Sequence, residues 1–224
     1  MSSDTYVKHA VAEVERELLQ VEDRLRTRVT TPITLGYRPE LDTTAELDPQ
    51  RANYYQGLIG VLWWICELGR LDILVATAMM SRHTVNPRRG HLEQVFHIFA
   101  FLKAHDRSTM VFDDTEPFFE EQRFVQCDWS EFYPGAAEVE PPNAPELCGK
   151  SVIMSGFVDA DHAGCRATRC SHTGIIIFLN RAPIMWYSKR QNTVESSTVG
   201  SEYITTKMAV EMFTMQATDD GHPG

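Results

Sequence analysis

The sequence predicts an α/β chain in which a helical region precedes a small β-sheet with a helix packed on it. Two observations lead to this prediction. Apolar residues recur at helical spacing in several segments before residue 105, whereas three short strand-like runs and one amphipathic stretch follow residue 150. A length of 224 residues with 43% hydrophobic residues is enough for one large or two small domains with a buried core.

The first predicted element is an amphipathic helix within residues 1–31. Its apolar stripe recurs at alternating intervals of four and three residues: Val7, Val11, Val14, Leu18, Val21 and Leu25. Ser2 or Ser3 can cap its start, and Pro32 ends it, because a residue before proline avoids helical angles. The stripe is typical of a helix docked on a core. It is also compatible with self-association as a coiled coil.

A helical connection region is predicted over residues 32–134. After a loop, Asp48-Pro49 starts a long helix, since aspartate is a good N-cap and proline suits the first helical position. Gly69 closes this helix. Two more helices are expected, a short one capped by Asp72 and a third over residues 91–103 with an apolar face.

An acidic, proline-rich linker is predicted at residues 135–149. It lies within the segment 113–147, whose ten acids and one arginine hold a charge of −9 of the chain's net −10. Phosphate affinity comes mainly from Lys and Arg, so an acidic chain is a poor non-specific nucleic-acid binder. Any nucleic-acid role therefore depends on a local basic patch or on a larger parent protein.

The strand-like runs define a last domain over residues 150–224. Strands are expected at residues 151–158, 173–180 and 183–188, and a helix begins at Ser196 or Ser197. The first strand leads into Asp159 and Asp161, and Glu202 falls on the first turns of the helix. Carboxylates from a strand end and a helix start can hold divalent metal beside a phosphodiester. Taken alone, the Asp-x-Asp pattern is equally compatible with a strand-end turn.

The five cysteines, at positions 66, 127, 148, 165 and 170, contain no Cys-x-x-Cys pair. This favours reduced thiols in an intracellular protein, cytoplasmic or nuclear. His162, Cys165, Cys170 and His172 lie close in sequence, but the Cys170-x-His172 spacing is too tight for ordinary zinc fingers. No apolar run reaches the ~20 residues of a membrane span, and the N-terminal residues contain no secretory signal.

Four ordered blocks of the last domain carry a family resemblance. They read Phe157-Val-Asp-Ala-Asp-His-Ala-Gly164, Arg169-Cys-Ser-His-Thr-Gly174, Pro183-Ile-Met-Trp-Tyr-Ser-Lys-Arg-Gln191 and Thr193-Val-Glu-Ser-Ser-Thr-Val-Gly-Ser-Glu-Tyr203. Together they closely resemble the ribonuclease H domain of copia-type retrotransposon polyproteins. Upstream, Tyr54–Gly60, Arg70–Ile73 and His91–Lys103 look like the segment that joins the reverse transcriptase to that domain.

The resemblance covers most of residues 36–212 and implies a truncated ribonuclease H-like mixed sheet with a packed helix. Residues 1–31 would then be the tail of the polymerase region, although no Tyr-x-Asp-Asp polymerase motif occurs. By the same resemblance, Asp159 and Glu202 are the first two catalytic carboxylates and ligands of Mg²⁺ in a two-metal site, and Asp161 is an auxiliary carboxylate. The family's third carboxylate has no counterpart, so weak or absent nuclease activity is expected.

The resemblance also implies an RNA–DNA hybrid as the partner. Eight residues have suitable side chains to hold it: Ser188, Lys189, Arg190, Gln191, Asn192, Thr193, Ser196 and Ser197. Basic and amide groups contact phosphates, and hydroxyl or amide groups bond the ribose 2′-OH. Other expected partners are the remaining polyprotein domains, or a second copy through the N-terminal helix.

Two hypotheses about function follow. In the first, the parent polyprotein hydrolyses the RNA strand of RNA–DNA hybrids with Mg²⁺ during reverse transcription. In the second, the chain is a catalytically inactive remnant that binds nucleic acid or protein weakly.

Overall fold

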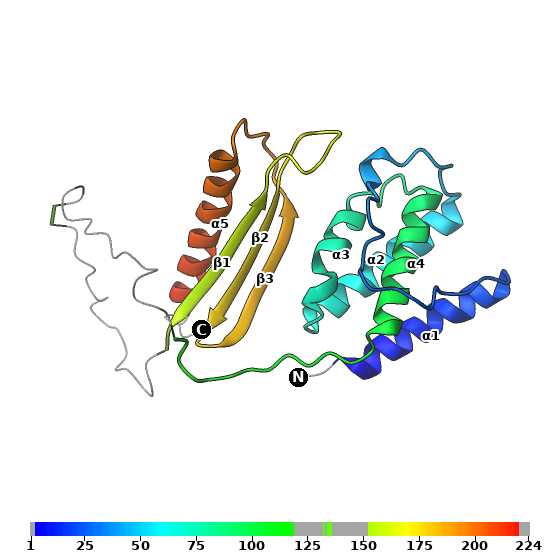
Figure 1. The fold of residues 1–224 in the computed structure, drawn as a ribbon, viewed down its shortest axis with the longest axis horizontal. Helices are drawn as coiled ribbons and strands as arrows, with labels where there is room; N and C mark the ends of the chain where they lie inside the picture. Colours follow the sequence, from blue (N-terminus) through cyan, green and yellow to red (C-terminus); the bar gives the residue numbers. More distant parts are fainter. Residues whose placement is uncertain (1–2, 119–131, 133, 136–151, 220–224) are drawn as a thin grey trace.

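The computed structural model describes residues 3–118, 132, 134–135 and 152–219. Its elements in chain order are α1 (Asp4–Gln20), η1 (Pro39–Leu41), α2 (Pro49–Glu67), η2 (Leu71–Ile73), α3 (Leu74–Ser81), α4 (Arg89–Ala104), β1 (Met154–Asp161), β2 (His172–Leu179), β3 (Ala182–Arg190) and α5 (Thr198–Asp219). The sheet stands between α5 and the helical region of α1–α4 (Figure 1). The predicted α/β class is confirmed, while the expected linker lies, beyond Gly135, outside the described residues.

The helices α1, α2 and α4 share one apolar core. The stripe of α1 contributes Val7, Val11, Val14 and Leu18, each at most 6% exposed, to this core. The prediction of an amphipathic helix docked on a core is therefore confirmed. The chain's own core already covers the stripe that would form a coiled-coil seam. No helix in the described part of the chain is long and apolar enough to cross a membrane.

The helix α1 ends at Gln20, well before Pro32, where the sequence predicts its end. Glu22 adopts φ 56°, its N–H donates to the carbonyl of Leu19, and the N–H of Asp23 donates to that of Leu18. This is a Schellman arrangement, which usually has glycine at the left-handed position. Beyond it, Leu25 is buried from an irregular segment, whereas Val21 is exposed.

The predicted start of α2 is confirmed, and the predicted cap of the next helix is wrong. Asp48 Oδ1 accepts a hydrogen bond from the N–H of Arg51 at 2.9 Å. Asp72 instead lies within η2, where its carboxylate accepts hydrogen bonds of 2.9 and 2.7 Å from the guanidinium of Arg70. Because Arg70 is almost fully buried, its charge requires this partner more than a helix end requires a cap.

The three described strands form an antiparallel sheet in the order β1-β2-β3. The mixed sheet that the resemblance implies is not present among these strands. Ile175 and Ile177 of β2 pack with Ala209 of α5, whereas Trp186 of β3 packs on the core of the helical region. The sheet therefore has two different faces, one towards α5 and one towards the helices α2 and α3. In this sheet β1 is an edge strand, and Phe157 on it is 61% exposed.

Candidate functional site

Asp159 lies near the end of β1, on the sheet face turned away from α5. In the strand register it pairs with Gly174, which in turn pairs with Ser188. Paired positions share a face, and successive residues alternate between faces. The next row contains Val158 and Ile175, and Ile175 belongs to the cluster under α5. The Asp159 row therefore faces the helical region.

A cavity of about 210 Å³ lies on this face. The sheet contributes Asp159, Asp161 and Ser188 to its lining, and the helical region contributes Arg38, Glu40 and Arg82. The sequence-predicted carboxylates Asp159 and Asp161 thus share a cavity with two guanidinium groups. None of the lining residues comes from α5.

Glu202 stands in the first turns of α5, whose start is fixed by two sets of hydrogen bonds. The N–H of Gly200 donates to Ser197 Oγ at 3.1 Å, so Ser197 caps the helix as predicted. The buried Gln191 donates through Nε2 to the carbonyl of Ser201 at 3.0 Å and to Thr205 Oγ1 at 3.2 Å. Glu202 is half-buried at this anchored end and is not part of the cavity that contains Asp159.

Asp159 and Glu202 are the residues expected to hold Mg²⁺. Carboxylate oxygens suit Mg²⁺, and a two-metal site needs several of them around one point. Asp159 lies on the sheet face turned away from α5, the helix that carries Glu202, and Arg38, Arg82 and Glu40 line the cavity of Asp159. Within the described ranges no three His, Cys, Asp or Glu side chains are grouped to hold a metal ion, zinc included. Among the described residues, Asp159 and Glu202 thus have no third such ligand grouped with them, and Mg²⁺ at these two carboxylates stays a prediction.

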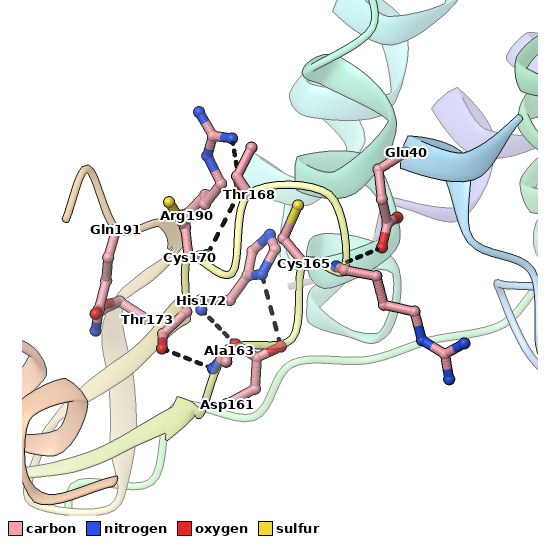
Figure 2. A network of polar contacts seen from close by, with 12 residues as sticks. Glu40, Asp161, Ala163, Cys165, Thr168, Cys170, His172, Thr173, Arg190 and Gln191 are labelled. Carbon is pink, nitrogen blue, oxygen red and sulfur yellow. Dashed lines mark hydrogen bonds and ion pairs between the residues drawn. The ribbon is translucent and has the colours of Figure 1, made fainter. Parts of the chain in front are cut away.

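Asp161 has a structural role at the start of the connection from β1 to β2. Its Oδ1 accepts a hydrogen bond from the N–H of His172, and its Oδ2 lies 3.6 Å from His172 Nδ1 (Figure 2). A Cβ atom at Gly164 would lie 1.9 Å from Asp161 Oδ2. The carboxylate thus lies against its own hairpin connection, with 51% of the side chain exposed. This geometry supports the strand-end turn as the reason for the second aspartate.

Arg82 of the helical region joins this connection to the helices, a contact that sequence reasoning missed. Its Nη1 lies 3.3 Å from His172 Nε2, and its Nη2 donates to Cys165 Sγ at 3.4 Å. Arginine has no acceptor, so Arg82 is the donor in this contact and His172 Nε2 the acceptor. No spacing in the sequence indicates a pair 83 residues apart.

The thiol of Cys165 is tuned by these contacts. Burial raises its pKa, but hydrogen bonds from the side chains of Thr168 and Arg82 outweigh burial and lower the pKa from 9.0 to about 7. A second link lies close by, since the N–H of Arg166 donates to Glu40 Oε1 at 3.0 Å (Figure 2). The β1–β2 connection is therefore held to the helical region by polar contacts on both sides.

The eight residues expected to hold nucleic acid divide into two groups. Gln191 is only 4% exposed, and its amide nitrogen donates hydrogen bonds inside the protein. Ser188 is also buried and lines the cavity of Asp159. Arg190 is partly buried, and its Nη1 donates to Thr168 Oγ1 at 3.4 Å. The other five are exposed around the turn between β3 and α5: Lys189, Asn192, Thr193, Ser196 and Ser197.

The chain is similar to retrotransposon polyproteins among the curated proteins. The chain is 24% identical over 198 residues to the retrovirus-related Pol polyprotein from transposon TNT 1-94 of Nicotiana tabacum. The aligned region covers 85% of this chain and 12% of that protein. The chain is 24% identical over 176 residues to the retrovirus-related Pol polyprotein from transposon RE1 of Arabidopsis thaliana, covering 78% of this chain and 9% of that protein.

A third relative is shorter. An uncharacterized mitochondrial protein of Arabidopsis thaliana is 46% identical over 50 residues, which cover 22% of this chain and 21% of that protein. No family model matches the chain, and no solved structure matches it. The similarities indicate a segment derived from a retrotransposon polyprotein, and the chain spans about an eighth or less of the two Pol polyproteins.

Proposed function

We propose that the chain is the ribonuclease H-like segment of a copia-type retrotransposon polyprotein and that it binds RNA–DNA hybrids. The observation that carries the proposal is the similarity to a Pol polyprotein over 85% of the chain, an extent that includes both the helical region and the sheet. Asp159 near the end of β1 and Glu202 on the first turns of α5 occupy the two positions that the resemblance gives to catalytic carboxylates.

The hybrid-binding surface of this proposal is the turn between β3 and α5. Lys189, Asn192 and Thr193 are exposed there, next to the exposed hydroxyls of Ser196 and Ser197. Lysine and amide groups contact phosphates, while hydroxyls bond the 2′-OH that distinguishes an RNA strand. The buried Gln191 stabilises this turn, because its amide donates hydrogen bonds to the first turns of α5.

Hydrolysis of the RNA strand is proposed for the parent polyprotein, and binding without efficient hydrolysis for this chain. The specific observation that favours binding without hydrolysis, over hydrolysis, is the placement of the carboxylates. Asp161 contacts His172, and Asp159 faces away from α5, the helix that carries Glu202. When Mg²⁺ is bound in such enzymes, it activates water and stabilises the leaving oxygen. The side chains described here do not gather for that chemistry.

Hybrid binding is tested by fluorescence anisotropy with a labelled RNA–DNA hybrid and a DNA duplex of the same sequence. Thr193→Glu places a negative charge on the proposed surface, and we expect it to weaken hybrid binding roughly fivefold or more at low salt. Thr5→Glu, at an exposed position on the first turn of α1, is the matched control and should leave binding unchanged. Absence of hybrid binding, or equal affinity for the DNA duplex, would refute the proposal.

A further inference from the structure

A second cavity lies between β3 and the helices α2 and α3, and it shares Lys189 and Asn192 with the edge of the proposed hybrid surface. It has a volume of about 400 Å³, within the range of roughly 300–1,000 Å³ that is usual for sites taking a small molecule or one nucleotide unit. We call it the tryptophan groove, after two indole rings in its lining. The residues that matter to its chemistry are Trp63, Glu67, Arg82, Trp186, Lys189 and Arg190.

The two indole rings are held in place by the protein. Trp63 of α2 and Trp186 of β3 are each half-buried, and both pack against the core of the helical region. Their remaining surface lines the groove. An aromatic ring fixed in this way loses little rotamer freedom when a planar ligand stacks on it. Packing against the core thus leaves part of each ring available to a ligand.

The charge of the groove is opposite to that of the whole chain. Among the described residues that line it, three are basic and Glu67 is acidic, whereas the chain as a whole has a net charge of −10. Arg82 is engaged by Cys165 and His172, so it acts mainly as a fixed positive charge. Lys189 is exposed at the rim and can meet a phosphate from solvent. A local excess of positive charge beside aromatic faces favours an anionic ligand with rings.

We propose that the tryptophan groove binds single-stranded nucleic acid, with bases stacked on Trp63 and Trp186 and phosphates near Lys189 and Arg190. Stacking platforms combined with cationic side chains are what single-strand binders use, and stacking accepts any base. A paired base does not present its face in this way, so the groove favours an unpaired strand over a duplex. The inference goes beyond hybrid binding, because it assigns a cavity lined by two indole rings and a different ligand.

The test measures anisotropy of labelled oligothymidylate and oligouridylate of about 12 nucleotides, in EDTA so that no metal-dependent cleavage intervenes. We expect Trp63→Leu to weaken binding about fivefold or more through lost stacking. Trp64→Leu is the matched control, because Trp64 follows on the same helix, is 54% exposed and is not part of the groove. It should change the affinity less than about twofold.

A second pair of variants keeps the test decisive if Trp63→Leu does not fold. Lys189→Ala at the groove rim should weaken binding and reduce its salt dependence. Lys207→Ala removes an equally exposed lysine from α5, outside the groove, and should do neither. No binding of either oligonucleotide by the wild type, or equal effects of the two lysine variants, would overturn the inference. Comparison of the two oligonucleotides shows whether DNA or RNA is preferred.

The outcome is separable from that of the hybrid assay. Single-strand binding that is lost in Trp63→Leu and kept in Thr193→Glu supports the groove, even where the hybrid is not preferred over duplex DNA. Hybrid binding that is sensitive to Thr193→Glu, with no affinity for single strands, supports the proposed function and refutes the groove.

Discussion

Cys165 combines burial with a lowered thiol pKa, two properties that oppose each other. It is 2% exposed, and burial alone would keep its thiol protonated. Hydrogen bonds from Thr168 and Arg82 favour the thiolate instead, and Arg82 brings a positive charge from the helical region. The pKa of the Cys165 thiol therefore depends on the contact between the helical region and the β1–β2 connection.

The lowered pKa of Cys165 predicts a pH-dependent contribution to stability. The folded pKa of about 7 lies below the ordinary value of 9.0, so this contribution is fully present above pH 9 and is lost as the pH falls through 7. Cys165→Ser should therefore lower the free energy of unfolding more at pH 9 than at pH 6, as measured by urea denaturation. An equal loss at both values would show that Arg82 does not stabilise a thiolate.

Single residues also show what the sequence could and could not predict. Asp48 and Ser197 were predictable as caps, because a cap bonds residues three positions away. Gln191 was assigned to nucleic acid because its neighbours are basic and polar, but it is buried under α5. Its partners, Ser201 and Thr205, follow 10 and 14 positions later, and only the packing of α5 on the sheet brings them near.

Among the elements, the connection between β1 and β2 leaves little room for a side chain at Gly164. A side chain at Gly164 would collide with the carboxylate of Asp161, which cannot move away without losing its hydrogen bond to His172. Gly174, across from Asp159 on β2, has only an ordinary contact of 3.8 Å at the same test position. The two glycines therefore have different tolerance to substitution.

Gly164→Ala should lower the free energy of unfolding by about 1–3 kcal/mol through overpacking. Gly174→Ala, the matched control on the adjacent strand, should change it by less than about 1 kcal/mol. Thermal and urea unfolding of both variants check the difference. A smaller loss of unfolding free energy in Gly164→Ala than in Gly174→Ala would contradict the close contact between Gly164 and the Asp161 carboxylate.

Element boundaries were harder to predict than element types. The periodic stripe of α1 gave the correct element and the correct buried face. Its end was missed because Glu22, rather than glycine, takes the left-handed position. The strands of the sheet were predicted within a few residues, since alternating apolar residues change to turn residues at each end.

At the scale of the whole molecule, the helical region and the sheet are joined on one face of the sheet. Arg82 contacts Cys165 and His172, and Trp186 packs on the helical core. The sequence predicted both parts and their order, but not that this face would carry Asp159. Strand periodicity tells which residues share a face, but not which partner covers that face, so the separation of Asp159 from Glu202 required the structure.

The most direct measurement is cleavage of a hybrid with a labelled RNA strand, in Mg²⁺ or Mn²⁺, by the wild type, Asp159→Asn and Glu202→Gln. Glu211→Gln is the matched control, because Glu211 is exposed on the same helix and pairs only at the surface with Lys207. The arrangement described here predicts that the hybrid is bound and the RNA stays intact with all four proteins. Metal-dependent cleavage by the wild type and Glu211→Gln that both other variants lose would contradict it, because Asp159 and Glu202 would then share a metal site.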